Sequence, residues 1–338
     1  MTTRVLLTID TEIAWRHQAA GLSWRDALAR SYDPAGVGIP FQLRVLAEHG
    51  LKACFFVDPM PALVHGLEPI RQMVGPILDA GQEVQLHLHP FWAAIGRDRA
   101  AAVHQELGDL PFAEQHALIG EARDLLAAAG APPPTAFRAG SYAANADTLQ
   151  ALAALGLSYD SSHNGSHHPH PSALPLPPDQ VAPIAVGGIV EVPVSQIEAS
   201  PGRLRHLQVC ALSLDEMIGA IDHARRWRHP LVTIVSHSFE LATRDGLRVN
   251  EIARRRFVGL CEWLCAHAER VPTATFAGLA GLPLAAPARP MQGRPLQVAR
   301  RVVEQAWGDL RYEKPGRSLN AAAASSVGGI EVLAAYVL

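Results

Sequence analysis

The chain has 338 residues, of which 49% are hydrophobic and 18% are charged, and its formal net charge is −3. This length can bury a large core without disulfides, and the near-neutral charge gives no electrostatic basis for binding nucleic acid or an anionic membrane surface. No stretch approaches the ~20 apolar residues of a membrane span, and the apolar run before Asp10 is too short for a signal peptide, so a cytoplasmic protein is expected.

Short apolar runs alternate with helix-like segments along the chain. Strands are expected at Val5–Ile9, Lys52–Val57, Glu83–His89, Thr135–Arg138, Leu157–Ser161, Ile189–Val194 and Leu231–Ser236. Helices are expected at Phe41–His49, Ile70–Ala80, Glu114–Ala129, Asn145–Leu155, Leu214–Arg226 and Glu251–Ala268. This alternation predicts an α/β fold in which crossover helices connect a parallel sheet, most simply closed as a βα barrel.

Two segments do not follow this alternation. The segment His163–Pro183 is rich in His, Pro and Ser and is expected to be an irregular, solvated loop that follows a strand. The end of the chain turns to Pro, Ala and Arg, with one helix expected at Leu296–Leu310. We therefore predict a barrel domain over 1–285 and a C-terminal extension over 286–338.

Polar residues of catalytic type stand where five of the expected strands end. They are Asp10, Glu12, His87, His89, Arg138, Asp160 and His237. Barrel enzymes carry their chemistry on this edge, in the loops that follow the strands. Each of these residues alone would be unremarkable, but their common placement predicts one site.

The two spaced pairs among these residues suit a metal site. In extended backbone the side chains of Asp10 and Glu12 lie on one side, as do those of His87 and His89. One carboxylate can then bind a cation while the other takes a proton from water. Two imidazoles and a carboxylate suit Zn²⁺ and leave room for a water molecule. The alternative for Asp10 and Glu12 is a pair of solvated carboxylates at a strand end, and the alternative for the histidines is a structural role.

Three further residues are open to two interpretations. Trp92, close after His89, belongs either to a sugar-stacking wall or to the core. Asp160 and His237 either form a carboxylate–imidazole pair, in which the carboxylate favours the protonated ring, or have separate structural roles.

The ordered motifs resemble those of the polysaccharide deacetylases, the NodB-homology group of carbohydrate esterase family 4. LLTIDTE, GQEVQLHLHP, FRAGSYAAN, YDSS and VTIVSH resemble the five motifs of that family in their order. Three departures stand out. The first motif usually has adjacent aspartates, the second usually spaces its histidines by three residues, and the third normally has prolines after its Arg.

The resemblance implies a distorted (β/α) barrel of the polysaccharide-deacetylase type with a divalent metal, Zn²⁺ being the expected ion. Glu12, His87 and His89 would hold the metal. Asp10, held by Arg138, would be the base, although exchange between Asp10 and Glu12 stays open. His237, oriented by Asp160, would be the acid, and a backbone N–H near Ser141 or Tyr142 would stabilise the oxyanion.

The expected reaction is hydrolysis of an N-acyl group, first of all an N-acetyl group, from an amino sugar or small glycan. Two alternatives remain open from the sequence. One is an amidase that acts on a non-sugar amide or ureide. The other is a non-catalytic glycan-binding relative, against which the presence of every candidate catalytic residue argues.

Overall fold

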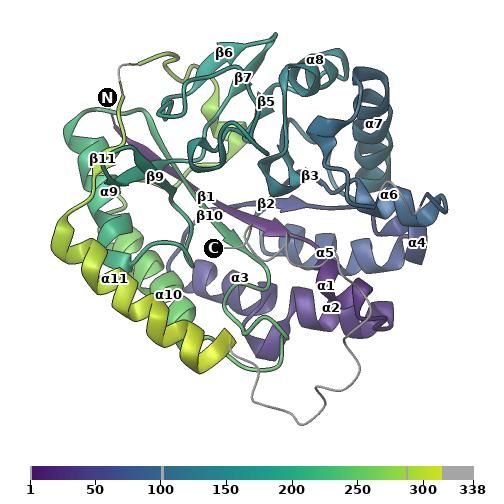
Figure 1. The fold of residues 1–338 in the computed structure, drawn as a ribbon, viewed down its shortest axis with the longest axis horizontal. Helices are drawn as coiled ribbons and strands as arrows, with labels where there is room; N and C mark the ends of the chain where they lie inside the picture. Colours follow the sequence, from purple (N-terminus) through teal and green to yellow (C-terminus); the bar gives the residue numbers. More distant parts are fainter. Residues whose placement is uncertain (1, 100–102, 287, 314–338) are drawn as a thin grey trace.

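A computed structural model describes residues 2–99, 103–286 and 288–313. In sheet order, its central strands are β10 (Leu231–His237), β1 (Arg4–Thr11), β2 (Cys54–Val57), β3 (Glu83–Leu88), β4 (Ala136–Ala139), β5 (Tyr159–Asp160), β7 (Ile189–Glu191) and β6 (Ile184–Val186). Neighbours run parallel except β6 and β7. The sheet curls into an open half-barrel (Figure 1). This confirms the distorted (β/α) barrel that the family resemblance implied, although the sheet is not closed.

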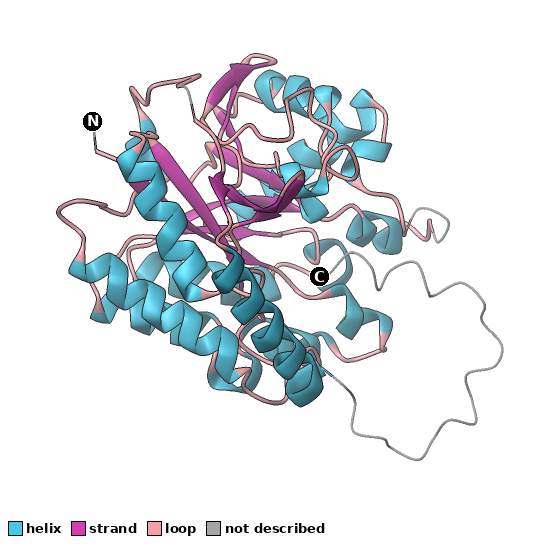
Figure 2. Ribbon diagram, turned by 60° about the vertical axis from the view of Figure 1, so that its left-hand side comes forward, coloured by secondary structure: helices cyan, strands magenta, loops and turns pink. Residues whose placement is uncertain are grey.

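The helices lie outside this sheet (Figure 2). They are α1 (Trp15–Ala19), α2 (Trp24–Tyr32), α3 (Ile39–Glu48), α4 (Ala62–His65), α5 (Glu68–Asp79), α6 (Phe91–Gly96), α7 (Phe112–Ala128), α8 (Ala146–Ala154), α9 (Leu214–Arg226), α10 (Glu251–Ala266) and α11 (Pro295–Gly308). Every predicted helix is present within a few residues of its expected bounds. The short helices α1, α2, α4 and α6 were not expected, because pieces of four to nine residues carry little periodic signal.

Alternation along β1 explains how the fold positions polar groups. Val5, Leu7 and Ile9 pack into the main apolar core, whereas Leu6 joins a second cluster with Phe56 and Phe276. Because side chains alternate between the two faces of a strand, Thr8 and Asp10 continue along the face of Leu6. The main core therefore fills one face of β1, and the opposite face changes from apolar to polar towards its C-terminal end.

A small second sheet lies beside the open edge of the half-barrel. It consists of β11 (Met291–Gln292), β8 (Gln196–Ser200) and β9 (Arg203–His206). The chain on either side of this hairpin bonds to β10: the Ser195 amide donates to the Thr233 carbonyl, and the Val209 amide to the Val235 carbonyl. This contact partly closes the curl, and it brings the segment around 206–209 next to the end of β10.

The described part of the C-terminal extension packs on the barrel. Arg301 of α11 forms a buried ion pair with Glu216 of α9 at 3.1 Å, and Glu304 pairs with Arg256 of α10 at 2.5 Å. A π-helical turn, Asp309–Glu313, follows α11. The rest of the extension, including Ala321–Ala324, lies outside the described residues. Within the described part of the chain, no helix has the length and apolarity that membrane crossing requires.

Candidate active site

The C-terminal ends of β10, β1, β3 and β4 bring most of the predicted residues together, and β2 lies between β1 and β3. Asp10 on β1 is in register with His237 on β10, and His87 on β3 is in register with Arg138 on β4. Parallel strands end on one edge of a sheet, so residues far apart in sequence meet there. Glu12 and His89 follow directly after β1 and β3.

Glu12, His87 and His89 form a three-residue cluster of metal-ligand type. Their candidate ligand atoms all lie within 4.8 Å of one another. Glu12 Oε2 is 2.5 Å from His89 Nε2 and 3.5 Å from His87 Nε2. His87 Nδ1 lies 2.8 Å from the Arg138 carbonyl, which can only accept, so Nδ1 carries the proton and Nε2 presents a lone pair to the cluster. Two imidazole nitrogens and one carboxylate oxygen are a donor set that fits Zn²⁺.

Electrostatics hold Glu12 as a carboxylate. Burial by itself would raise the pKa of Glu12, but the charge of His89 and its hydrogen bond to Glu12, together with the neighbouring His87, hold that pKa well below the usual range. Burial likewise opposes a charge on His89, yet the Glu12 carboxylate raises the pKa of His89 to about 10. Glu12 and His89 therefore form a close pair in which each favours the charged form of the other.

Gly140 leaves the space in which the His89 ring lies. A Cβ atom at this position would stand 2.3 Å from His89 Nδ1 and 2.4 Å from its Cε1. Such contacts are impossible without movement of the ring, so any side chain at 140 displaces His89.

We predict that Gly140→Ala weakens metal binding by at least about tenfold, in the range found when the support behind a ligand is lost. Titration of the metal-free protein with Zn²⁺ in competition with a chelator measures this. Gly75→Ala on α5, where a Cβ meets nothing within 4 Å, is the matched control and should bind metal normally. Equal affinities for both variants would contradict the proposed position of His89.

Asp10 is held by Arg138, as predicted. Arg138 is 0% exposed, and its Nη1 donates to Asp10 Oδ1 at 2.6 Å and to Thr8 Oγ1 at 3.0 Å. Its remaining donors bond to the carbonyl and hydroxyl of Ser161, and its guanidinium lies 4.3 Å over the Phe56 ring. Arg138 is thereby immobilised, and it engages one oxygen of Asp10. The other oxygen, Oδ2, is 3.8 Å from His237 Nε2.

The predicted pairing of Asp160 with His237 is wrong. Asp160 accepts hydrogen bonds from the hydroxyl and amide of Ser162, and it interacts with Glu191 on the adjacent strand β7. His237 Nδ1 instead contacts Gln208 Nε2 at 3.2 Å. Asp160 lies on β5, and four strands lie between β5 and β10 in the sheet. The sequence showed that both residues end strands, but it did not show the order of those strands in the sheet.

Asp160 and Glu191 form a buried carboxyl pair. Both side chains are 0% exposed, and Glu191 Oε1 accepts from the His163 amide at 2.9 Å. Burial, and then the neighbouring Asp160, raise the pKa of Glu191 well above its usual range, and burial also raises the pKa of Asp160. Two buried carboxyl groups that interact directly do not both ionise readily, so we infer that this pair shares a proton.

We predict that Glu191→Gln makes folding stability less dependent on pH. The pKa of Glu191 is higher in the folded state than in the unfolded state. The contribution of Glu191 to the free energy of unfolding is therefore complete below the unfolded pKa of about 4.3, and it is lost as pH rises towards the folded pKa. Gln supplies a permanent N–H donor towards Asp160. The variant should therefore gain stability over wild type at pH 8 but not at pH 4.5, with each kcal/mol raising the Tm by about 2 °C. Parallel melting curves in a pH series would contradict this.

Ser141 and Tyr142 lie at the site in a left-handed turn, with φ of 53° and 59°. Left-handed backbone is strained for residues other than glycine and tends to occur at functional positions. Burial raises the pKa of Tyr142, and the charge of Asp10 raises it further. The Tyr142 phenol therefore lies close enough to the Asp10 carboxylate to interact with it. Their proposed oxyanion role stays a prediction.

Trp92 is 0% exposed and packs against His65 and Phe91, so its assignment to a sugar-binding wall is wrong.

The histidine-rich loop is less solvated than expected. His163 is 0% exposed, and burial lowers its pKa to about 4. The His167 ring lies 5.7 Å from Tyr142 and 5.1 Å from His206, whereas His170 is exposed. The loop thus covers the interior beside Tyr142.

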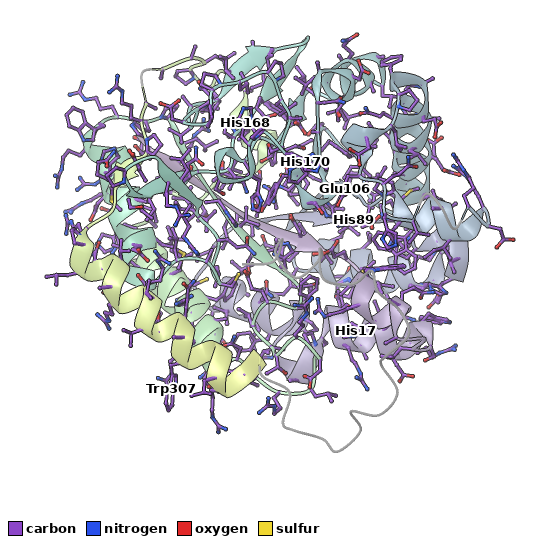
Figure 3. All side chains as sticks on the ribbon, in the orientation of Figure 1. His17, His89, Glu106, His168, His170 and Trp307 are labelled. Carbon is purple, nitrogen blue, oxygen red and sulfur yellow. The ribbon has the colours of Figure 1, made fainter. Side chains whose placement is uncertain are left out.

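Sequence reasoning missed two acidic residues next to the metal cluster. Asp58 directly follows β2, is 0% exposed and interacts electrostatically with both His89 and His87. Burial raises its pKa to about 6. It could have been found, because it follows a predicted strand in the same way as Asp10. Glu106 lies beside His89 (Figure 3) and interacts with Ser141, but it belongs to a loop that no pattern singles out.

Part of the chain that carries the site matches a known protein family. Residues 38–159 match the family described as polysaccharide deacetylase. This matched segment, about a third of the chain, is similar to polysaccharide deacetylases. The matched region includes His87, His89 and Arg138, whereas Asp10, Glu12 and His237 lie outside it. None of the curated proteins matches the sequence.

Solved structures share the fold of this chain. A putative polysaccharide deacetylase from Mycobacterium smegmatis is 22% identical with a TM-score of 0.54, over 86% of this chain and 94% of that one. A 4-alpha-glucanotransferase from Thermococcus litoralis is 12% identical with a TM-score of 0.50, over 84% of this chain and 42% of that one. A family 4 carbohydrate esterase from Streptomyces lividans in complex with acetate is 16% identical with a TM-score of 0.42, over 84% and 98%. The first two of these matches show that the half-barrel is a known architecture.

Proposed function

We propose that the protein is a metal-dependent deacetylase that hydrolyses the N-acyl group, first of all N-acetyl, of an amino sugar or small glycan. The observation that carries the proposal is the juxtaposition of two unlike groups in a chain that is similar to polysaccharide deacetylases. Glu12, His87 and His89 converge as metal ligands. Beside them, Asp10 is held by a buried arginine and presents a second oxygen towards His237.

The structure supports different roles for the two carboxylates of the D-x-E motif. Glu12 is committed to the histidine cluster, whereas Asp10 is committed to Arg138. A divalent cation held by the cluster would polarise the acyl carbonyl and make water easier to deprotonate. The base is then Asp10 and the ligand is Glu12, not the reverse.

Asp10 acts through its Oδ2 atom, since Arg138 engages Oδ1. Oδ2 removes a proton from a water molecule as the water oxygen attacks the acyl carbon. His237 Nε2 faces the same space and donates a hydrogen bond to the reacting group. The strained turn at Ser141 and Tyr142 offers backbone N–H groups to the developing oxyanion. Breaking the C–N bond releases a carboxylic acid and the free amine.

Acetate release from a substrate panel tests the proposal. The full chain, loaded with Zn²⁺, is incubated with N-acetylated amino sugars and their short oligomers, with O-acetylated sugars, with N-acetyl amino acids and with cyclic ureides. We expect acetate from the N-acetylated sugars, loss of turnover after chelation, and recovery when Zn²⁺ is restored. Turnover confined to ureides or amino acids, or unaffected by complete metal removal, would overturn the proposal.

A further inference from the structure

A chain of hydrogen bonds runs from the small second sheet to the inner side of His237. His206 Nε2 lies 2.6 Å from Gln208 Oε1, and Gln208 Nε2 lies 3.2 Å from His237 Nδ1. The same Gln208 Nε2 donates to Glu240 Oε1 at 2.8 Å. Gln208 thus occupies the place behind the histidine where the sequence predicted a carboxylate.

Glu240 determines which way the Gln208 amide is turned. Its Oε1 also accepts from the backbone amide of Cys210 at 3.1 Å, and its Oε2 accepts from Ser236 Oγ at 2.8 Å and from the His237 amide at 3.2 Å. Backbone N–H groups can only donate, so both oxygens of Glu240 are acceptors. Gln208 must therefore direct its NH₂ group, and not its carbonyl, towards Glu240.

The orientation of the amide in turn determines the tautomer of His237. Because an NH₂ group faces Nδ1, that nitrogen must accept, and a neutral ring then carries its proton on Nε2. The residue is also held through its backbone, since its carbonyl accepts from Gln42 Nε2 at 3.1 Å. The charged groups nearest to it are Asp10, towards which Nε2 points at 3.8 Å, and Glu240.

We propose that Gln208, oriented by Glu240, is a positioning residue that holds His237 in the Nε2–H form, and that Asp10 therefore carries the proton to the leaving nitrogen. The first half stands on the geometry of the described residues, and the second half rests on the proposed function. A proton added to Nδ1 would face the Gln208 NH₂ group. The amide would have to turn over, breaking its bond to Glu240.

The proton balance then needs only one acid–base group. Asp10 takes a proton from the attacking water, and the protonated carboxyl gives that proton to the amide nitrogen as the C–N bond breaks. The carboxylate is regenerated, and the products are the acid and the amine. His237 keeps its Nε2 proton throughout and acts as a neutral hydrogen-bond donor, a role known for histidine in other enzymes.

Long-range ¹H–¹⁵N correlation spectra of protein labelled at histidine test the tautomer directly. The signal of His237 is assigned from its absence in His237→Ala, and spectra are recorded at neutral pH without substrate. We expect the shifts of an unprotonated Nδ1 and a protonated Nε2. A ring protonated on Nδ1, or on both nitrogens, would overturn the proposal.

Two variants test whether Gln208 determines the tautomer of His237. Gln208→Met keeps the length of the side chain but removes the amide, so the Nε2–H preference should be lost and kcat should fall about tenfold with little change in KM. Gln72→Met, at an exposed position on α5, should change neither. An unchanged tautomer in folded Gln208→Met would show that Gln208 does not set it.

The spectra and the activity assay fail independently. If no acetylated substrate is hydrolysed but His237 has the Nε2–H form, the proposed function fails while the role of Gln208 stands. If substrates are hydrolysed while His237 is doubly protonated, the function stands and this inference fails.

Discussion

Asp10→Asn should lower kcat by about 10³-fold while the content of bound metal stays unchanged. General-base groups contribute roughly 10² to 10⁴ in rate, and Asp10 is the carboxylate that faces the site with an oxygen not engaged by Arg138. Asn keeps an oxygen for Arg138 Nη1 but replaces the basic Oδ2 with an amide. The kcat for the best substrate of the panel, together with elemental analysis, measures both quantities.

The control for this prediction must separate loss of the base from loss of the fold. Arg138 is fully buried, so removing the charge of Asp10 leaves a buried cation with a weaker partner, and some loss of stability is expected. Melting temperatures are therefore measured alongside kcat. Asp222→Asn, at the half-exposed end of α9, should leave both unchanged. Retention of more than about a tenth of wild-type kcat by Asp10→Asn would exclude Asp10 as the base.

His87→Ala and His89→Ala should each weaken metal binding more than about 100-fold and abolish turnover that depends on the metal. Each substitution removes one of three protein ligands, which exceeds the 10- to 100-fold effect of losing a group that only supports a ligand. Wild-type protein reconstituted with Zn²⁺ should hold about one equivalent, as three ligands and an open position imply.

Elemental analysis after gel filtration checks this expectation. His116→Ala on α7, whose ring contacts Phe112 on the outer helix layer, is the matched control and should keep its metal. Wild-type protein without metal after reconstitution, or equal metal in all variants, would mean that the cluster is not a metal centre. In that case the proposed reaction would lose its basis.

The residues at the ends of the strands could be predicted from the sequence, because apolar runs and their boundaries are local properties. Parallel strands place their C-terminal ends on one edge whatever the details of packing, so Asp10, His87 and Arg138 were expected together and are together. The spacing of D-x-E and H-x-H likewise predicted a cluster of metal-ligand type, since side-chain alternation in extended backbone is a property of the chain itself.

The partner behind each of these residues was decided by the tertiary structure. Asp160 pairs with Glu191 and not with His237, because the strand order puts β7 beside β5. Trp92 is in the core because a short helix after His89 turns it inward, and an aromatic residue after a strand does not reveal its direction.

Gln208 and Glu240 illustrate the same limit on the His237 side. Gln208 lies just after β9 and Glu240 just after β10, and neither forms a motif. They meet because the chain around the second sheet bonds to the edge of β10. The sequence by itself determined which chemical groups reach the edge of the sheet, through local periodicity. Only the tertiary structure decided which neighbours orient them, because those neighbours come from strands and loops whose order depends on long-range packing.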